Sequence, residues 1–205
     1  MIAIYLAAGE SRRMKAHKLA LPLGKTTVGN SGLQTVLQSN LDYIFVITRE
    51  ADALTWIDSE LFLPPFRNRW TPLSCSDSVK GQAYSLRRGL LAALDRKPEG
   101  IMVLLADQPF LSLSIINDLI LSYRKHKKNV GFVAARFQGI PRPPIIFSTE
   151  VIPALLKLQG DEGARKLLLS QELAGKFVDY ENARDFLDID TKEDYEKVKG
   201  GYLYR

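Results

Sequence analysis

The sequence predicts an α/β domain in which an open, mainly parallel sheet carries helices on both faces. Apolar runs at 2–6, 43–48, 101–105 and 130–135 are the expected strands, and helical patterns separate them. The first, third and fourth runs are almost continuously apolar, which is typical of strands covered on both faces. Because parallel sheets bind ligands at the carboxyl ends of their strands, we expect the functional site at that edge.

Helical patterns are expected at 32–38, 79–94, 113–125, 150–158, 163–170 and 191–199. In the second of these, leucines recur at i, i+4, i+5 and i+8 from Leu86, which marks one apolar face. The segment 139–144 reads GIPRPP, and its three prolines predict a rigid loop rather than a helix or a central strand. Residues 61–72, rich in proline, arginine and aromatic residues, are expected to form an irregular connection.

Length and composition favour one domain. A chain of 205 residues with 46% hydrophobic and 25% charged residues can bury a sizeable core. No apolar run approaches the roughly 18 residues that span a bilayer, and no basic segment precedes the apolar N-terminus. The single cysteine, Cys75, excludes an internal disulfide. We therefore expect a cytoplasmic protein with no membrane partner.

The net charge of +5 is concentrated in two clusters, Arg12, Arg13, Lys15 and Lys18, and Arg124, Lys125, Lys127 and Lys128. A basic chain can bind nucleic acid, acidic lipids or small anions. The second cluster follows an apolar helical stretch, where the helix dipole favours cations, and we interpret it as a solvated helix end. The first cluster follows the first strand directly. It favours an anionic small molecule, and no nucleic acid partner is expected.

The loop after the first strand reads LAAGESRRMKAHKL. Gly9 can adopt a positive φ, so that consecutive N–H groups form a concavity that binds anions. Arg12 or Arg13 can form bidentate phosphate contacts, and Lys18 adds a point charge. The alternative is a tight turn with exposed basic residues. The loop contains neither GxxxxGK[ST] nor GxGxxG, which disfavours a P-loop kinase or a dinucleotide fold.

Asp107 lies in ADQP, just past the third apolar run. A carboxylate at that edge can hold Mg²⁺ together with substrate phosphates, and the metal then neutralises charge at a reacting phosphate. The alternative is a helix N-cap, although Ser112 is better placed to cap the following helix. The two histidines, His17 and His126, have no partners at zinc-ligand spacing, which disfavours a zinc site.

Four ordered motifs between residues 2 and 198 resemble the nucleotidyltransferases of the molybdenum cofactor family. LAAGESRRM with Lys18-Leu19 resembles the family signature LAAGxSxRMG…K, with Lys15 where the family usually has glycine. ADQP, GQAYSLRRGL and FLDIDTKEDYEKV resemble its metal, helix-start and DxDTxED motifs. GDEGAR resembles a further family segment. The resemblance implies a single-domain, Rossmann-like, three-layer nucleotidyltransferase fold over residues 1–205, with a mostly parallel mixed sheet.

The resemblance also implies roles for individual residues. Phosphate contacts and catalysis would fall to Arg13, Lys18 and Asp107. The nucleotide would lie against Leu6, Ala7, Ala8, Gly9, Gly81, Gln82 and Ser85. Mg²⁺ would bind Asp107 and a second carboxylate. We expect only one of Asp188 and Asp190 to face the metal; we prefer Asp188 and keep Asp190 as the alternative. Arg165, in GDEGAR, would reach an acidic acceptor or lie on the surface.

The implied reaction transfers a nucleoside monophosphate to the terminal phosphate of molybdopterin with release of pyrophosphate. Ala-Ala-Gly in the first loop resembles the cytidylyl-transferring branch, which uses CTP and matures hydroxylases of the xanthine dehydrogenase type. Such an apoenzyme would be a transient partner. The segment GIPRPPIIF departs from the family pattern beside the acceptor. The alternatives are a guanylyltransferase, a sugar- or polyol-phosphate nucleotidyltransferase, and a non-catalytic cofactor chaperone.

Overall fold

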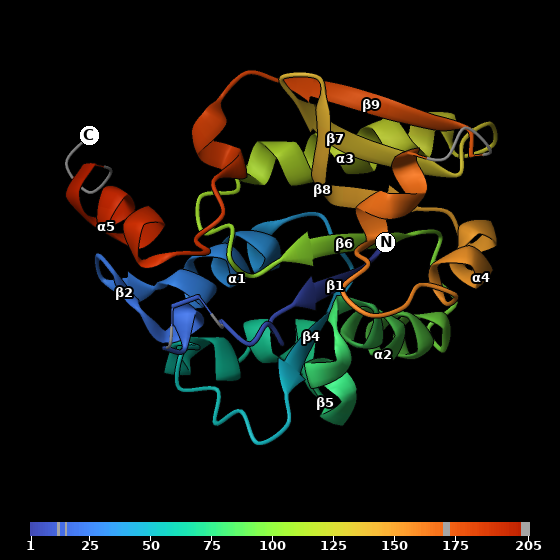
Figure 1. Cartoon of the computed structure of the whole chain (residues 1–205). Coiled ribbons are helices and arrows are strands. Elements are labelled where there is room, and N and C mark those ends of the chain that lie inside the picture. The colour runs from blue at the N-terminus through green and yellow to red at the C-terminus, as the bar shows by residue number, and fades with distance from the viewer. Residues whose placement is uncertain (12, 15, 170–172, 202–205) are drawn as a thin grey trace.

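The computed structural model describes residues 1–11, 13, 14, 16–169 and 173–201, and it is built around one seven-stranded sheet (Figure 1). In sheet order the strands are β5 (Trp70–Cys75), β4 (Tyr43–Arg49), β1 (Ile2–Leu6), β6 (Ile101–Leu105), β8 (Ile140–Phe147), β7 (Phe132–Phe137) and β9 (Gly175–Tyr180). β8 is antiparallel to both neighbours and the other pairings are parallel. The predicted α/β class is confirmed. Arg12, Lys15 and Ser170, named above, lie outside the described residues.

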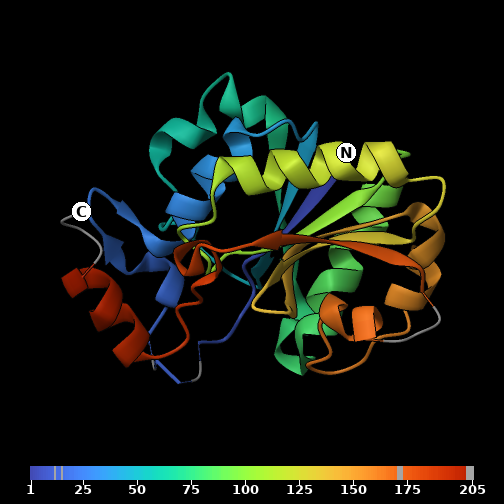
Figure 2. The same cartoon turned by 90° about the horizontal axis from the view of Figure 1, so that it is seen from above.

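Helices cover both faces of this sheet, as Figure 2 shows for α3 and α2 on opposite sides. The α-helices are α1 (Val28–Gln38), α2 (Gln82–Leu94), α3 (Leu113–His126), α4 (Ile152–Leu155) and α5 (Lys192–Gly201). Short 3₁₀ turns are η1 (Lys18–Ala20), η2 (Ser59–Phe62), η3 (Phe66–Arg69), η4 (Ser76–Lys80), η5 (Thr149–Val151), η6 (Ala164–Leu169) and η7 (Ala183–Phe186). A two-stranded ribbon joins β2 (Pro22–Leu23) to β3 (Thr26–Thr27). Within the described residues, no helix has the length and apolarity needed to span a bilayer.

The continuous apolar run of β1 serves two cores. Ala3 and Tyr5 pack with α1 and α3 on one face of the sheet, whereas Ile2, Ile4 and Leu6 pack with α2 on the other. This two-sided burial explains why the strand sequence does not alternate between apolar and polar residues. β1 runs parallel to β4 and β6, and the chain leaves the sheet at Leu6 and enters the basic loop.

The prediction of a loop at 139–144 is wrong, because residues 140–144 belong to β8 in the interior of the sheet. The strand tolerates its prolines because only residues 145–147 pair on both sides. The register on β7 jumps from Ile145 to Arg142, so Pro143 and Pro144 fall in an irregularity where no ladder position needs their N–H groups. Pro141 pairs only with β7.

Other expected boundaries also shift. Residues 70–72, expected in an irregular connection, begin β5, where the fully buried Trp70 donates its indole N–H to the Leu61 carbonyl at 2.8 Å. β9 was not predicted, and its partly exposed residues explain the weak apolar signal. The helix expected at 79–94 begins only at Gln82. The one expected at 150–158 is the short α4 preceded by the 3₁₀ turn η5, and the described part of 163–170 forms the 3₁₀ turn η6. The basic cluster after α3 follows a helix end, as expected.

Tyr5 connects β1 to α1 through a side-chain hydrogen bond. Its buried hydroxyl donates to the Gly29 carbonyl at 2.8 Å. A Cβ at position 32 would lie 2.5 Å from this hydroxyl, so α1 can approach the strand only because Gly32 has no side chain.

We predict that Tyr5→Phe lowers the free energy of unfolding by about 1–2 kcal/mol, because it leaves the buried Gly29 carbonyl without its donor. Urea denaturation measures this loss. Tyr123→Phe is the control, since the Tyr123 hydroxyl also donates to a carbonyl, that of Glu99. That hydrogen bond is only partly buried, so a smaller loss is expected. Equal stability of Tyr5→Phe and wild type would contradict the assignment.

Candidate nucleotide and metal site

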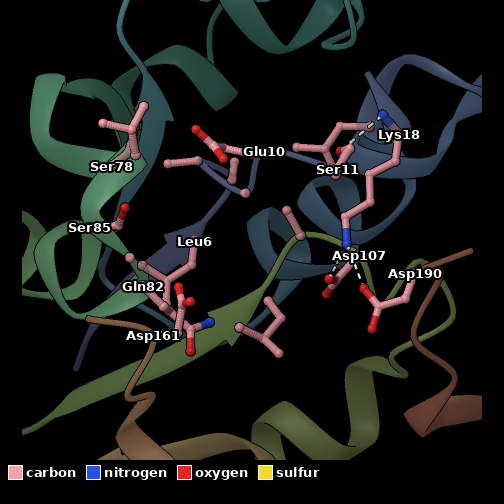
Figure 3. Close-up of a pocket in the computed structure, with 18 of the residues that line it drawn as sticks. Leu6, Glu10, Ser11, Lys18, Ser78, Gln82, Ser85, Asp107, Asp161 and Asp190 are labelled. Carbon is pink, nitrogen blue, oxygen red and sulfur yellow. Dashed lines mark hydrogen bonds and ion pairs between the residues drawn. The ribbon is translucent and has the colours of Figure 1, made fainter. Parts of the chain in front are cut away.

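A cleft of about 510 Å³ opens at the carboxyl ends of β1 and β6 (Figure 3). Every predicted site residue except Asp188 lines it: Leu6, Ala7, Ala8, Gly9, Arg13, Lys18, Gly81, Gln82, Ser85 and Asp107. β1 and β6 are parallel neighbours, so the loop after Leu6 and the acid after Leu105 emerge at the same edge. The α2 start completes the opposite wall.

The Lys18 ammonium lies between two carboxylates at one end of this cleft (Figure 3). Its Nζ is 2.6 Å from Asp107 Oδ2 and 3.0 Å from Asp190 Oδ1. Lys18 is 8% exposed. Its burial lowers the pKa of this amine, but the two neighbouring carboxylates outweigh burial and raise it. Lys18 is therefore held charged as the counter-ion of both acids.

A backbone contact explains why Asp190 reaches this end of the cleft. The Ile189 N–H donates to the Asp107 carbonyl at 3.0 Å, and Ile189 itself is fully buried. Asp190 lines this cleft and Asp188 lines a separate cavity. Two residues at this spacing on a regular strand would share one face, but residues 187–190 do not form a strand. The exposed Arg13 contributes a guanidinium nitrogen 3.8 Å from Asp190 Oδ2.

It is Asp190, and not the preferred Asp188, that shares Lys18 with Asp107. Asp188 accepts a hydrogen bond from Gln108 Nε2 at 2.8 Å and has an Arg142 nitrogen at 3.5 Å. It lines a second cavity of about 420 Å³. Burial, followed by the nearby charge of Asp107, raises the pKa of Asp188 from 3.8 to about 6. The choice of second metal ligand stays a prediction, and the geometry moves it to Asp190.

The two cavities share a wall made of Leu6, Gln82, Leu105 and Asp161. The second cavity continues beneath β8 and η6, where Arg142, Arg165 and Lys166 line it. Arg165, for which a surface position was the alternative, is exposed and also lines this cavity. A ligand in the first cleft therefore adjoins a cationic space large enough for a second molecule.

Close backbone packing builds the end of the cleft opposite Lys18. Gly81 has φ +124°, and a Cβ there would lie 2.1 Å from the Gly160 carbonyl carbon. The Ala83 N–H donates to the Gly160 carbonyl at 3.0 Å, which fastens the 160–163 turn to the start of α2. Gln82 lies at this junction, and a Cβ at Gly163 would touch its side-chain oxygen.

The sequence did not single out several lining residues, Glu10, Ser78, Val79 and Asp161 among them. Figure 3 shows Asp161 beside Gln82, at the end of the cleft remote from Lys18. Asp161 lies in the GDEGAR segment, between Gly160, which has φ +55°, and Gly163, where a Cβ would lie 2.4 Å from the Gln82 side-chain oxygen. The two glycines were the signal that this segment turns and packs closely against the start of α2.

The profile of the MobA-like NTP transferase domain matches residues 3–175. The chain belongs to this family. It is 41% identical to the purine catabolism protein PucB of Bacillus subtilis over an alignment of 201 residues. That alignment covers 97% of this chain and 96% of PucB. It is 27% identical over 199 residues to the molybdenum cofactor cytidylyltransferase of Escherichia coli, covering 97% and 95%.

Solved structures show the same fold. Rv0371c from Mycobacterium tuberculosis superposes with a TM-score of 0.77 at 24% identity, covering 97% of each chain. A structure of Rv0371c in complex with manganese matches with a TM-score of 0.69 at 23% identity, covering 96% of each chain. The MobA-like transferase fold predicted from the motifs is thereby confirmed.

The acidic end of the cleft fits a hard divalent cation. Asp107 Oδ1 is buried and has no hydrogen-bond partner among the described residues, although Oδ2 is bonded to Lys18. Carboxylate oxygens are the ligands that Mg²⁺ and Mn²⁺ prefer. In the described part of the chain no three acidic, histidine or cysteine side chains converge on one point. That arrangement suits a metal held by one or two carboxylates with phosphates completing its shell.

We predict that Asp188→Asn raises the melting temperature at pH 8 and raises it less at pH 5. Because the folded protein binds the Asp188 proton more tightly than the unfolded chain does, stability from this group falls as the pH rises from the ordinary pKa of 3.8 to about 6, and part of that loss is already present at pH 5. The amide removes this cost and still accepts from Gln108. Thermal melting in EDTA measures both values.

Asp179→Asn is the matched control, since the Arg136 ion pair holds the pKa of Asp179 below its ordinary value. This variant should not gain stability at pH 8. A melting temperature for Asp188→Asn that falls equally at both pH values would show that Asp188 is stabilised as a carboxylate.

Proposed function

We propose that this chain is a Mg²⁺-dependent cytidylyltransferase that transfers CMP from CTP to molybdopterin phosphate and releases pyrophosphate. The observation that carries the proposal is the meeting of the loop after β1, Asp107 and Asp190 around Lys18 in one cleft. A carrier would not need paired acids beside a phosphate loop. The similarity to the cytidylyltransferase of E. coli supports CTP, and the similarity to PucB supports a role in purine catabolism.

In this proposal the nucleotide lies along the cleft from Gln82 to Lys18. Gly81, Gln82 and Ser85 contact the base at the start of α2, where helix N–H groups face the pocket. Leu6, Ala7, Ala8 and Gly9 pass along the base and ribose. Arg13 and Lys18 contact the phosphates, and Asp107 with Asp190 would hold Mg²⁺, which when bound neutralises charge on the triphosphate.

The acceptor occupies the second cavity, which opens beside the shared wall at Leu6 and Gln82. An oxygen of its terminal phosphate attacks the α-phosphorus of CTP, and the bond from that phosphorus to the bridging β-phosphate oxygen breaks. The acceptor phosphate is already ionised, so the reaction needs no protein base. The chain contributes alignment of the two phosphates and cationic charge around them. Arg142 and Arg165 supply charge on the acceptor side.

The nucleotidylated product would pass to an apoenzyme of the xanthine dehydrogenase type, and we place the reaction in the cytoplasm, where the buried Cys75 stays reduced. The reaction is tested with purified protein, Mg²⁺, molybdopterin and each of the four NTPs, by measuring pyrophosphate release. We expect kcat/KM for CTP to exceed that for GTP by about tenfold or more, from base contacts worth about 1.4 kcal/mol.

Other outcomes of this assay distinguish the rivals. A preference for GTP indicates a guanylyltransferase, and turnover with a sugar or polyol phosphate in place of molybdopterin indicates a different acceptor. Binding of molybdopterin without pyrophosphate release indicates a cofactor chaperone. Each of these results would overturn the proposal.

We predict that Asp107→Asn lowers kcat about hundredfold or more, because it removes a metal-ligand charge beside the reacting phosphates. Asp190→Asn should raise the Mg²⁺ concentration needed for half-maximal rate about tenfold. Asp188→Asn is the matched control and should leave that concentration within about twofold. Titration of Mg²⁺ at saturating CTP measures these effects. The reverse order, with Asp188→Asn the more damaging, would restore Asp188 as the ligand.

A further inference from the structure

The described structure contains a cation at the place where the proposed function needs a metal. Lys18 Nζ lies 2.6 Å from Asp107 Oδ2 and 3.0 Å from Asp190 Oδ1, and the Lys18 side chain is 10% exposed. Mg²⁺ and Mn²⁺ bind carboxylate oxygens at about 2.0–2.2 Å. An ammonium and a divalent ion that share the same two carboxylates repel each other at close range in a poorly solvated site. The two cations therefore compete.

We propose that Lys18 is an internal cation that closes the metal site until a triphosphate draws it away. The inference rests on the proposed function, because it takes Asp107 and Asp190 as the metal ligands. A nucleotide in the cleft offers the ammonium new anionic partners, and the departure of Lys18 frees both carboxylates. Nucleotide and metal then each tighten the binding of the other by the same factor, as linkage requires.

Local structure lets Lys18 move without disturbing the fold. The Lys18 N–H lies 3.4 Å from Ser11 Oγ, and the backbone forms the first turn of η1, so its Cα is held at the cleft wall. The ammonium is on a flexible four-carbon stem and can change partners by rotation of that stem. The contact is also incomplete, since Asp107 Oδ1 stays buried and unpaired among the described residues. Lys18 satisfies Asp107 less fully than a metal can.

The consequence is an order of events. Free protein holds little divalent metal, so a metal does not occupy the cleft without substrate. Release of pyrophosphate removes the anions that hold Lys18, and the ammonium then returns to the two acids and weakens the metal site. Arg13 does not serve the same role, because it is largely exposed and its nearest nitrogen is 3.8 Å from Asp190.

The test is the Mn²⁺ affinity of nucleotide-free protein, measured by the electron paramagnetic resonance signal of free Mn²⁺. Lys18→Met keeps an unbranched side chain of nearly the same length and removes its charge, and it should bind Mn²⁺ about tenfold tighter or more than wild type. Lys18→Arg keeps the charge and should show no gain. Lys80→Met is the matched control: Lys80 is exposed, pairs with Asp77 and is not among the residues lining the cleft, so Mn²⁺ affinity should change less than about twofold.

A non-hydrolysable CTP analogue completes the experiment. It should tighten Mn²⁺ binding to wild type by a larger factor than to Lys18→Met, in which the site is already open. If Lys18→Met is unfolded in EDTA, its folding on addition of Mn²⁺ is measured by circular dichroism in place of its Mn²⁺ affinity. Mn²⁺ should then restore its fold, or raise its melting temperature by more than that of wild type.

The outcomes separate this inference from the proposed function. One outcome overturns the inference and leaves the transferase proposal standing. In that outcome wild type binds Mn²⁺ in the presence of the analogue, but folded Lys18→Met shows no gain in Mn²⁺ affinity in its absence. If Lys18→Met binds Mn²⁺ more tightly than wild type but wild type does not turn over CTP, the closed cation site is supported and only the proposed activity is overturned. Absence of Mn²⁺ binding in every variant, with or without the analogue, overturns both.

Discussion

The contact of Lys18 with Asp107 and Asp190 is the interaction on which the site depends. It joins side chains 89 and 172 residues apart, and only the sheet order makes that possible. Parallel pairing of β1 with β6 brings the basic loop and Asp107 to one edge, and the Ile189 N–H bond to Asp107 adds the third group. Lys18 serves as counter-ion to both carboxylates only when all three segments meet, so fold and electrostatics at this edge are one constraint.

A second constraint is the wall between the two cavities. Gln82 and Asp161 lie at the joint where the 160–163 turn packs against the start of α2, and glycines at 81, 160 and 163 make that packing possible. One side of the wall holds the basic loop after β1 and the paired acids. The other holds Arg142, Arg165 and Lys166. A group transfer between two anionic molecules needs this arrangement, in which each has its own countercharge.

The sequence predicted the sheet class and the residues that gather in the cleft, because apolar strand runs and loop motifs are local signals. It did not predict β8 as an interior strand, because prolines normally disrupt the hydrogen bonding of such strands. That Pro143 and Pro144 fall in a register break cannot be seen in the sequence. β9 was missed because its partners are distant and its residues only partly buried. The sequence offered Asp188 and Asp190 as alternative partners of Asp107, but which one meets it depends on the backbone bond of Ile189, a contact between segments far apart.

The central claim is that one nucleotide and one cation are held between the loop after β1 and the paired acids. A crystal structure with CTP and Mn²⁺ tests it most directly, through the anomalous signal of manganese. The account predicts a manganese peak within ligand distance of Asp107 and Asp190, a triphosphate beside Gly9 and Arg13, and Lys18 on a phosphate oxygen. A nucleotide bound outside this cleft, or manganese remote from both acids, would contradict it.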